Sequence, residues 1–253
     1  ADRAGVRERH RKITEKHGAS TADTVFRIFR AVYNRGLREH PELPGNPTAN
    51  VDYHGLRRRK VDSNADKLNA WGKAVLTLHP VRRDLHLFMI LTGMRRTSAC
   101  EARIGDLDLS SKRLHVPKPK GGAQRAFDLP LSGPLADLLG QRQSESPRLH
   151  RKSPWLFPAD SKSGHVAEVA QHELDGLTGH ALRHTYATLA LQAGVPIAEL
   201  KFLLNHAAGN VTMGYLNPSL DHLRGYQERA SAYVLDALGL RWTEGEWPPR
   251  LKE

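Results

Sequence analysis

Residues 178–217 read TGHALRHTYATLALQAGVPIAELKFLLNHAAGNVTMGYLN, and the rest of the chain is organised around them. His180 and Arg183 are three residues apart, so both side chains lie on one face of a predicted helix. His206 follows an apolar stretch with helical spacing, and Tyr215 comes nine residues later, after an Ala-Ala-Gly-Asn break. The segment therefore brings two imidazoles, a guanidinium and a phenol toward one place. That set suits a reaction in which a hydroxyl attacks an anion.

Two earlier cations complete this cluster. Arg95 follows a Thr-Gly turn at the start of a short predicted helix, and Lys120 lies in a Gly-flanked hairpin from which it can reach a site. Lys118, in the same loop, is an alternative to Lys120. Arg95 and Arg183 would supply two guanidiniums, and each guanidinium can grip two oxygens of a phosphate. The pattern indicates a phosphate-handling site.

The four segments that carry these residues resemble, in the same order, the motifs of the tyrosine recombinase (phage integrase) family. LTGMRRTSACEARIGDLDL resembles the first arginine box, and PKPKGGAQRAFDLPLS resembles the hairpin that carries the family's lysine. HALRHTYAT matches the His-x-x-Arg box, and LLNHAAGNVTMGYLN matches the segment with the late His and the tyrosine. The resemblance covers residues 90–217, and residues 20–60 resemble the end of the family's core-binding domain more weakly. It assigns catalytic roles to Arg95, Lys120, His180, Arg183, His206 and Tyr215.

This resemblance implies a site-specific DNA recombinase that integrates or excises a mobile element. Tyr215 would attack a DNA phosphodiester and form a 3′-phosphotyrosyl bond, with His180 as general base or acid and Lys120 as general acid to the leaving 5′-oxygen. Arg95, Arg183 and His206 would meet the charge on the nonbridging oxygens. Protein cations would then do the work of a metal, and the covalent intermediate conserves the bond energy. The expectation is chemistry with no metal, no ATP and no other cofactor.

The sequence departs from the family pattern at two positions. Ser98 stands where an acidic residue usually follows the first arginine by three positions, and Asn205 replaces the usual glycine before the late histidine. The acidic residue orients its neighbours in the family, so the change to Ser98 weakens the expectation of activity only slightly. A full-length member of the family would also have more sequence before residue 1, including half of a DNA clamp.

The predicted fold is mainly α with a small antiparallel β-sheet, an α+β catalytic domain like that of tyrosine recombinases and type IB topoisomerases. We assign residues 1–50 to a partial helical core-binding domain, 51–63 to a basic linker, and 64–253 to the catalytic domain with its C-terminal helix. Three short strands are predicted at 107–109, 113–116 and 125–129. The last helix, after Tyr215, suits either a core position or docking on a neighbouring protomer.

The N-terminal quarter combines a basic surface with a weak apolar pattern. Residues 1–18 read as a frayed helix or a basic arm. From Ser20, with Asp23 as the partner in a capping box, a helix is predicted whose apolar face includes Val25, Phe29 and Val32. Its opposite face carries arginines placed for phosphates, although a solvated basic face explains them equally well. The residues expected to contact DNA are Arg27, Arg30, Arg57, Arg58, Arg59 and Lys60.

Charge supports a polyanionic partner. The chain of 253 residues has a formal net charge of +11 and a sequence pI near 10.0. Residues 1–60 hold 14 Lys and Arg against 7 Asp and Glu, so most of the excess lies in the first quarter. Nucleic acid is the simplest partner for such a distribution, while a merely basic protein is the alternative.

Other features bound the class of protein. The sequence contains no run of about 18 apolar residues, so we expect no membrane span. The start ADRAGVRERH is polar and charged and does not resemble a signal peptide. A single cysteine, Cys100, excludes an internal disulfide framework and any cysteine-based zinc cluster. We therefore expect a cytoplasmic protein associated with the bacterial nucleoid.

The expected partner is double-stranded DNA with attachment sites. The resemblance implies a homotetramer on DNA in the synaptic complex, with a monomer as the free form, and accessory proteins that bend DNA or set direction. The alternative from another class is a non-catalytic DNA-binding protein that kept the fold. A topoisomerase-like enzyme or a resolvase would use the same residues, and a metal-dependent nuclease is the unrelated option.

His180 and His184 could ligate a metal, and Tyr186 is expected to pack in the core.

Overall fold

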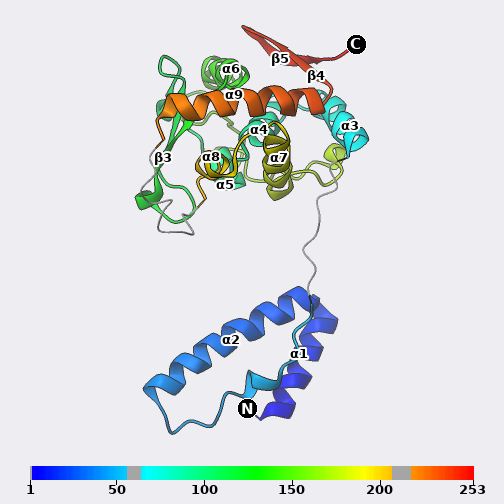
Figure 1. Ribbon diagram of the computed structural model, residues 1–253, viewed down its shortest axis with the longest axis vertical. Coiled ribbons are helices and arrows are strands. Elements are labelled where there is room, and N and C mark those ends of the chain that lie inside the picture. Colours follow the sequence, from blue (N-terminus) through cyan, green and yellow to red (C-terminus); the bar gives the residue numbers. More distant parts are fainter. Residues whose placement is uncertain (1, 56–63, 207–217) are drawn as a thin grey trace. The chain divides into compact units, whose positions relative to one another are not determined.

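The computed structural model describes residues 2–55, 64–206 and 218–253, and the chain divides into two compact units (Figure 1). The first unit spans Ala1–Lys60 and the second Val61–Glu253. Each unit has its own apolar core. Within the described residues, none of the helices combines the length and the apolar character needed to cross a membrane.

The first unit is a pair of packed helices, α1 (Arg3–His17) and α2 (Ala19–Glu39), followed by a short 3₁₀ turn at Pro47–Asn50. Gly18 joins the helices with a φ of 86°, a conformation that residues with a Cβ rarely adopt. The core of this unit is small. Its cluster of buried apolar side chains consists of Val6, Phe26 and Val51.

Three expectations for this unit were wrong. Of the two alternatives for residues 1–18, the structure has the helix, at residues 3–17, with an N-cap at Asp2, so the basic arm and the fraying were wrong. No capping box starts α2: the helix begins at Ala19, and the Asp23 carboxylate is buried and bonds to histidines instead. The buried face of α2 is centred on Phe26, while Val25 and Val32 are 42% and 64% exposed. α2 therefore carries a second apolar stripe, which includes Val25 and Val32 and is exposed to solvent in this unit.

The segment after the 3₁₀ turn packs on the same unit. Val51 is buried in its core, and the rings of Tyr53 and His54 contact that of His10 on α1. These contacts place the start of the predicted 51–63 linker within the first unit. Residues 56–63 lie outside the described residues.

The second unit is built around the buried helix α4 (Pro80–Thr92), because residues 85 and 87–91 are all fully shielded from solvent. Four other helices pack on it: α3 (Ala65–Leu76), α6 (Gly133–Leu149), α7 (His180–Gln192) and α9 (Leu220–Ala237). Two short helices, α5 (Arg96–Cys100) and α8 (Ile197–Leu203), complete the unit. The apolar period of 3–4 residues in each long helix explains this bundle.

The predicted small sheet is present at one side of the bundle (Figure 1). Strands β1 (Leu107–Asp108), β2 (Arg113–Val116) and β3 (Phe127–Pro130) pair antiparallel in that order, with Leu114 opposite Leu129. The last strand starts later than predicted, because residues 123–125 form a 3₁₀ turn. A mainly helical fold with small antiparallel sheets is thus confirmed.

A second hairpin at the C-terminus was not predicted. β4 (Leu240–Thr243) and β5 (Glu246–Leu251) pair antiparallel, and β5 packs on α6. The Trp247 indole N–H donates to the buried carboxylate of Asp84 at 2.9 Å, and Arg142 binds the other oxygen of that carboxylate at 2.7 Å. Of the two roles left open for the last helix, α9 takes the core position, with Ala230 and Val234 fully buried.

Candidate active site

Arg183 is the buried centre of the site. It lies one turn into α7, and 5% of its surface is exposed. Its Nη1 donates to the carbonyl oxygen of Gly93 and its Nη2 to that of Leu204, both at 2.7 Å. Burial, and the charge of Arg95 beside it, lower the pKa of Arg183 to about 10, so it remains a cation at neutral pH. The guanidinium is therefore held by neutral carbonyls, and its positive charge is not neutralised.

Gly93 explains how the chain reaches this guanidinium. It ends α4 in the left-handed conformation, with a φ of 61°. A Cβ at this position would lie 2.4 Å from a ring carbon of Tyr186 and 2.6 Å from a methyl carbon of Leu204, so only glycine fits without a shift. The Thr-Gly turn identified in the sequence thus both ends α4 and presents a carbonyl to Arg183.

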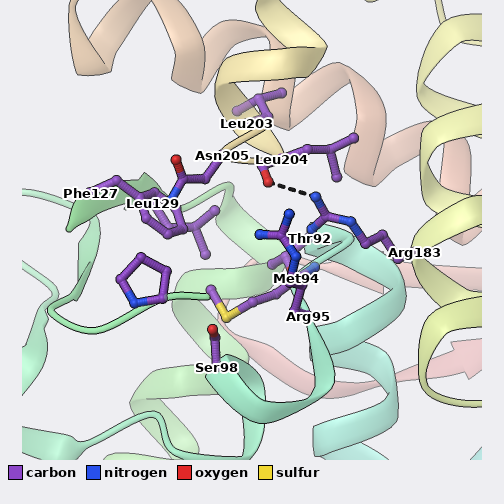
Figure 2. Close-up of a pocket in the computed structure, with 11 residues that line it drawn as sticks. Thr92, Met94, Arg95, Ser98, Phe127, Leu129, Arg183, Leu203, Leu204 and Asn205 are labelled. Carbon is purple, nitrogen blue, oxygen red and sulfur yellow. Dashed lines mark hydrogen bonds between the residues drawn. The ribbon is translucent and has the colours of Figure 1, made fainter. Parts of the chain in front are cut away.

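Arg95 lies next to Arg183 at the same pocket (Figure 2). It occupies the N-cap position of α5, and burial with the nearby charge of Arg125 lowers its pKa. Within the described residues, the Arg95 guanidinium has no hydrogen-bond or ion-pair partner. Ser98, which replaces the family's acidic residue, lines the same pocket. The pocket is lined by Thr92, Met94, Arg95, Ser98, Pro119, Phe127, Leu129, Arg183, Leu203, Leu204 and Asn205.

The pKa values of the two predicted histidines are lowered by this pair of cations. His180 is the first residue of α7, and His206 follows α8; both are exposed at their edges. Partial burial lowers the pKa of both imidazoles. The charges of His184, Arg183 and Arg95 lower the pKa of His180 further, and those of Arg183 and Arg95 do the same for His206. The charges of the two guanidiniums therefore act on both rings, and the lowered pKa favours the neutral form of each ring near pH 7.

Lys120 is in the connection between β2 and β3, as predicted. It is exposed and precedes Gly121 and Gly122, whose φ values are 111° and 88°. The charge of Lys120 is among those that lower the pKa of His180. The alternative, Lys118, is exposed in the same connection.

Sequence reasoning missed Arg125 as part of this site. Arg125 Nη2 donates to the carbonyl oxygen of Asn205 at 3.3 Å, and Asn205 Nδ2 donates to the carbonyl oxygen of Arg125 at 3.1 Å. Its charge lowers the pKa of Arg95 and of His206. The two residues are 80 positions apart in two different motif segments, and no pattern in the sequence links them.

The remaining predicted residues fall in three groups. Tyr215 lies outside the described residues, as do residues 57–60. Arg27 and Arg30 are exposed on α2 in the first unit. The rings of His180 and His184 meet edge to face with 4.5 Å between centroids, but no third metal-ligating side chain joins them among the described residues.

The buried tyrosine of the motif segment is excluded as a rival nucleophile. Tyr186 is fully buried, and its hydroxyl donates to Gln227 Oε1 at 3.0 Å. Burial raises the pKa of Tyr186 well above its ordinary value. The expectation that it packs in the core is confirmed.

Comparisons with known proteins agree with this architecture. Residues 64–222 match the model of the phage integrase family. Tyrosine recombinase XerA of Pyrococcus furiosus is 29% identical over 157 residues, which cover 59% of this chain and 55% of XerA. Tyrosine recombinase XerD of Agrobacterium fabrum is 29% identical over 233 residues, which cover 78% of this chain and 69% of XerD. The prophage integrase IntF of Escherichia coli is 26% identical over 186 residues, covering 69% of this chain and 39% of IntF.

Solved structures show the same fold. The integrase of the Tn1549 transposon, in complex with transposon right end DNA, superposes with a TM-score of 0.66 at 16% identity, over 90% of this chain and 85% of that chain. A lambda integrase tetramer bound to a Holliday junction gives a TM-score of 0.62 at 16% identity, over 83% of this chain and 66% of the lambda integrase chain.

These matches define a class of protein, the tyrosine recombinases. The chain belongs to the phage integrase family. It spans between about two fifths and just over half the length of the first curated relatives that it matches.

Proposed function

We propose that the chain is the catalytic part of a site-specific DNA recombinase that cuts and rejoins DNA through a 3′-phosphotyrosyl intermediate. One observation carries the proposal. Among the described residues, the cations Arg95, Lys120, Arg125 and Arg183 have no carboxylate partner, although the three arginines are partly or fully buried; the groups that bind Arg125 and Arg183 are carbonyls. Clustered cations without a counterion are costly unless an anion completes the site, and a DNA phosphate has the charge and shape to do so.

The proposed first step is attack of the Tyr215 hydroxyl oxygen on phosphorus. The P–O5′ bond breaks, a P–O bond to tyrosine forms, and the tyrosine proton passes to His180, whose lowered pKa leaves it neutral and able to accept it. Lys120 gives a proton to the leaving 5′-oxygen. The second step reverses these transfers with the 5′-hydroxyl of another strand.

Stabilisation of the charged transition state falls to the two arginines and His206. Arg183 is fixed by two carbonyls, which leaves little freedom to lose when the phosphate binds. Arg95 makes no competing hydrogen bond within the described residues. His206, neutral near pH 7 because of its lowered pKa, donates a hydrogen bond from its N–H group to a nonbridging oxygen. We propose that no metal ion or ATP takes part in these steps.

Two structural neighbours support a proposed assembly on DNA. The partner is double-stranded DNA with attachment sites, as for the Tn1549 integrase bound to transposon DNA, and the synaptic complex is a homotetramer, as for lambda integrase on a Holliday junction. Integration or excision of a mobile element in the bacterial cytoplasm is the role we infer, with accessory DNA-bending proteins as further partners.

Trapping of a covalent adduct tests this function. A nicked suicide substrate, built from DNA flanking the gene, is incubated with the parent chain and with Tyr215→Phe in EDTA. We expect a complex that resists SDS with the parent and none with the variant, since the variant lacks the attacking oxygen. Tyr186→Phe is the matched control, because it removes a buried hydroxyl from the same motif segment.

Two outcomes would contradict the proposal. An adduct that persists in Tyr215→Phe assigns the nucleophile to another residue. DNA binding without any adduct from the parent chain favours the non-catalytic DNA-binding alternative.

A further inference from the structure

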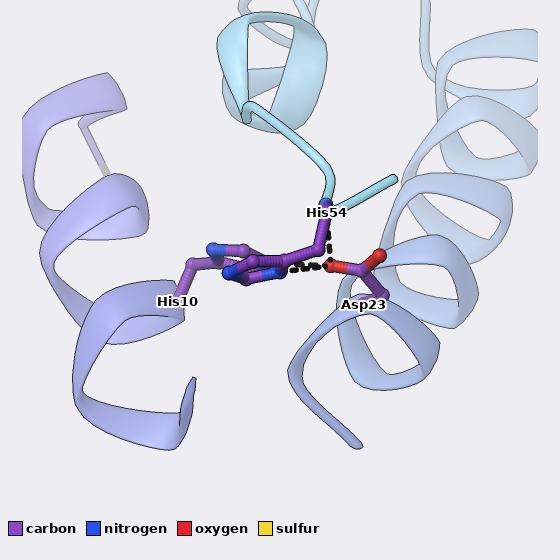
Figure 3. A group of neighbouring side chains, drawn as sticks. All are labelled: His10, Asp23 and His54. Atoms are coloured by element: carbon purple, nitrogen blue, oxygen red, sulfur yellow. Dashed lines mark hydrogen bonds and ion pairs between the residues drawn. The ribbon is translucent and has the colours of Figure 1, made fainter. Parts of the chain in front are cut away.

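Three metal-ligating side chains meet in the first unit (Figure 3). His10 comes from α1, Asp23 from α2 and His54 from the segment after the 3₁₀ turn. His10 Nε2 lies 3.1 Å and His54 Nδ1 2.9 Å from the same oxygen, Asp23 Oδ1, and all three ligand atoms lie within 4.8 Å of one another. We propose that His10, Asp23 and His54 bind one zinc-class divalent ion that stabilises the first unit.

The ligand set fits that class of ion. Imidazole nitrogens with a carboxylate oxygen suit Zn²⁺, whereas Mg²⁺ and Ca²⁺ prefer oxygen ligands alone. Ligands at Zn²⁺ bond lengths of about 2.0–2.1 Å lie roughly 3.3 Å apart in a tetrahedral site. The two nitrogen-to-oxygen distances of 3.1 and 2.9 Å differ from that spacing by a few tenths of an ångström. The third pair, His10 Nε2 and His54 Nδ1, lies within 4.8 Å, so the two rings would move toward each other as they close around an ion.

A second observation, independent of the spacing, points to a missing partner. Asp23 is fully buried, yet within the described residues its second oxygen, Oδ2, accepts no hydrogen bond. The exposed Arg27 forms a long ion pair with that oxygen, with Nη2 at 3.7 Å, which is too far for a hydrogen bond. The Tyr53 hydroxyl is also buried without a partner, and its ring lies 6.1 Å from that of His10. Buried polar groups without partners are rare and call for an explanation, and a bound cation supplies one for the carboxylate.

The size of the first unit gives such an ion a role. Among its described residues, the buried apolar cluster consists of Val6, Phe26 and Val51. Units this small commonly need a metal or a covalent link for stability, because the apolar surface that they bury is limited. Each ligand belongs to a different segment, so one ion would join α1, α2 and residues 51–55. It would also fix α2, which carries the basic face proposed to contact DNA.

A hydrogen-bonded His-Asp-His cluster without an ion is the alternative, and amide substitutions separate the two. In His10→Gln and His54→Asn, the amide nitrogen replaces Nε2 and Nδ1 and can still donate to Asp23. Neither amide nitrogen can ligate a metal ion. His40→Gln is the matched control, since it removes an exposed imidazole that bonds only to Glu42 among the described residues.

The experiment titrates the metal-free full chain with Co²⁺ and with Zn²⁺. Co²⁺ binding is followed by visible absorption, and the ions per chain are counted by mass spectrometry. We expect one site in the parent and in His40→Gln, weakened at least about 100-fold in His10→Gln and His54→Asn, since even outer partners of metal ligands contribute 10–100-fold. No binding by the parent, or equal binding by the amide variants, would overturn the proposal.

Hydrogen exchange gives a second readout within the parent chain. At a free Zn²⁺ concentration of about 100 times the Kd, amides of α1 and α2 should exchange about 100-fold more slowly, with no such effect from Mg²⁺. Unchanged exchange would refute the stabilising role even if the variants fail to fold. Neither readout uses DNA, so failure here leaves the proposed recombinase chemistry untouched.

Discussion

At the scale of single residues, Arg183 and Arg95 differ in how the protein holds their guanidiniums. Arg183 is fixed by the carbonyl oxygens of Gly93 and Leu204, so it contributes to the structure before any ligand arrives. Arg95 has no partner among the described residues and lowers the pKa of His180 and of His206. A preorganised cation beside a cation without a partner is the arrangement that the proposed phosphate binding requires.

The histidine pKa values test this electrostatic coupling. Both imidazoles should titrate below the ordinary pKa of 6.5, because burial and the charges of Arg183 and Arg95 disfavour the protonated form. Arg95→Ala removes one of those charges, so the pKa of His180 and of His206 should rise in the variant. The measurement is an NMR titration of the imidazole C–H resonances in the DNA-free chain.

Arg96→Ala is the matched control, because it removes an exposed guanidinium from the neighbouring position. If the pKa values of His180 and His206 stay where they are in Arg95→Ala, the guanidinium of Arg95 does not act on them. The proposed neutral state of the two rings would then rest on burial alone.

At the scale of elements, a reciprocal pair of hydrogen bonds joins the connection that carries Lys120 to the end of α8. Asn205 and Arg125 each donate to the other's carbonyl oxygen. Asn205 also has a φ of 44°, a left-handed conformation in which asparagine is tolerated and alanine is strained. Asn205, which stands where the resemblance leads us to expect glycine, thus adopts a conformation that suits glycine and adds a side-chain hydrogen bond.

Two substitutions at this position separate the bond from the backbone conformation. Asn205→Gly keeps the conformation and loses the side-chain bond, so the free energy of unfolding should fall by about 0.5–1.5 kcal/mol. Asn205→Ala adds left-handed strain of roughly 1 kcal/mol to that loss. Urea denaturation measures both, and hydrogen exchange of residues 119–126 should accelerate in either variant. Equal stability of the glycine variant and the parent would show that the bond contributes nothing.

Local patterns predicted the long helices and the motif residues, because 3.6-residue periodicity and short-range spacing are properties of the sequence itself. They failed where contacts between residues far apart in the sequence determine the structure. Asp23 resembled a capping residue, but its carboxylate is bound by His10 and His54, the latter 31 positions away. The C-terminal hairpin was missed because two prolines in β5 argue against a strand, while Trp247 is anchored by Asp84, 163 positions earlier.

At the scale of the whole molecule, the excess positive charge is concentrated in the first 60 residues, and four consecutive cations occupy positions 57–60. If these bind phosphates, DNA affinity should fall steeply with salt because condensed counterions are released. We expect replacement of all four by serine to reduce the slope of log K against log salt by about 0.9 for each phosphate that is no longer neutralised, up to about 3.6. Fluorescence anisotropy with labelled duplex DNA at several salt concentrations measures the slope.

A charge-matched control makes this last prediction specific. Arg148, Arg151, Lys152 and Lys162 are exposed cations of the second unit that form no ion pair among the described residues. Their replacement by serine lowers the net charge by the same amount as the change at 57–60. A slope that drops only in the 57–60 variant assigns phosphate binding to those four residues. An equal drop in both variants would mean that DNA senses the overall charge, and that the basic segment is not a specific part of the clamp.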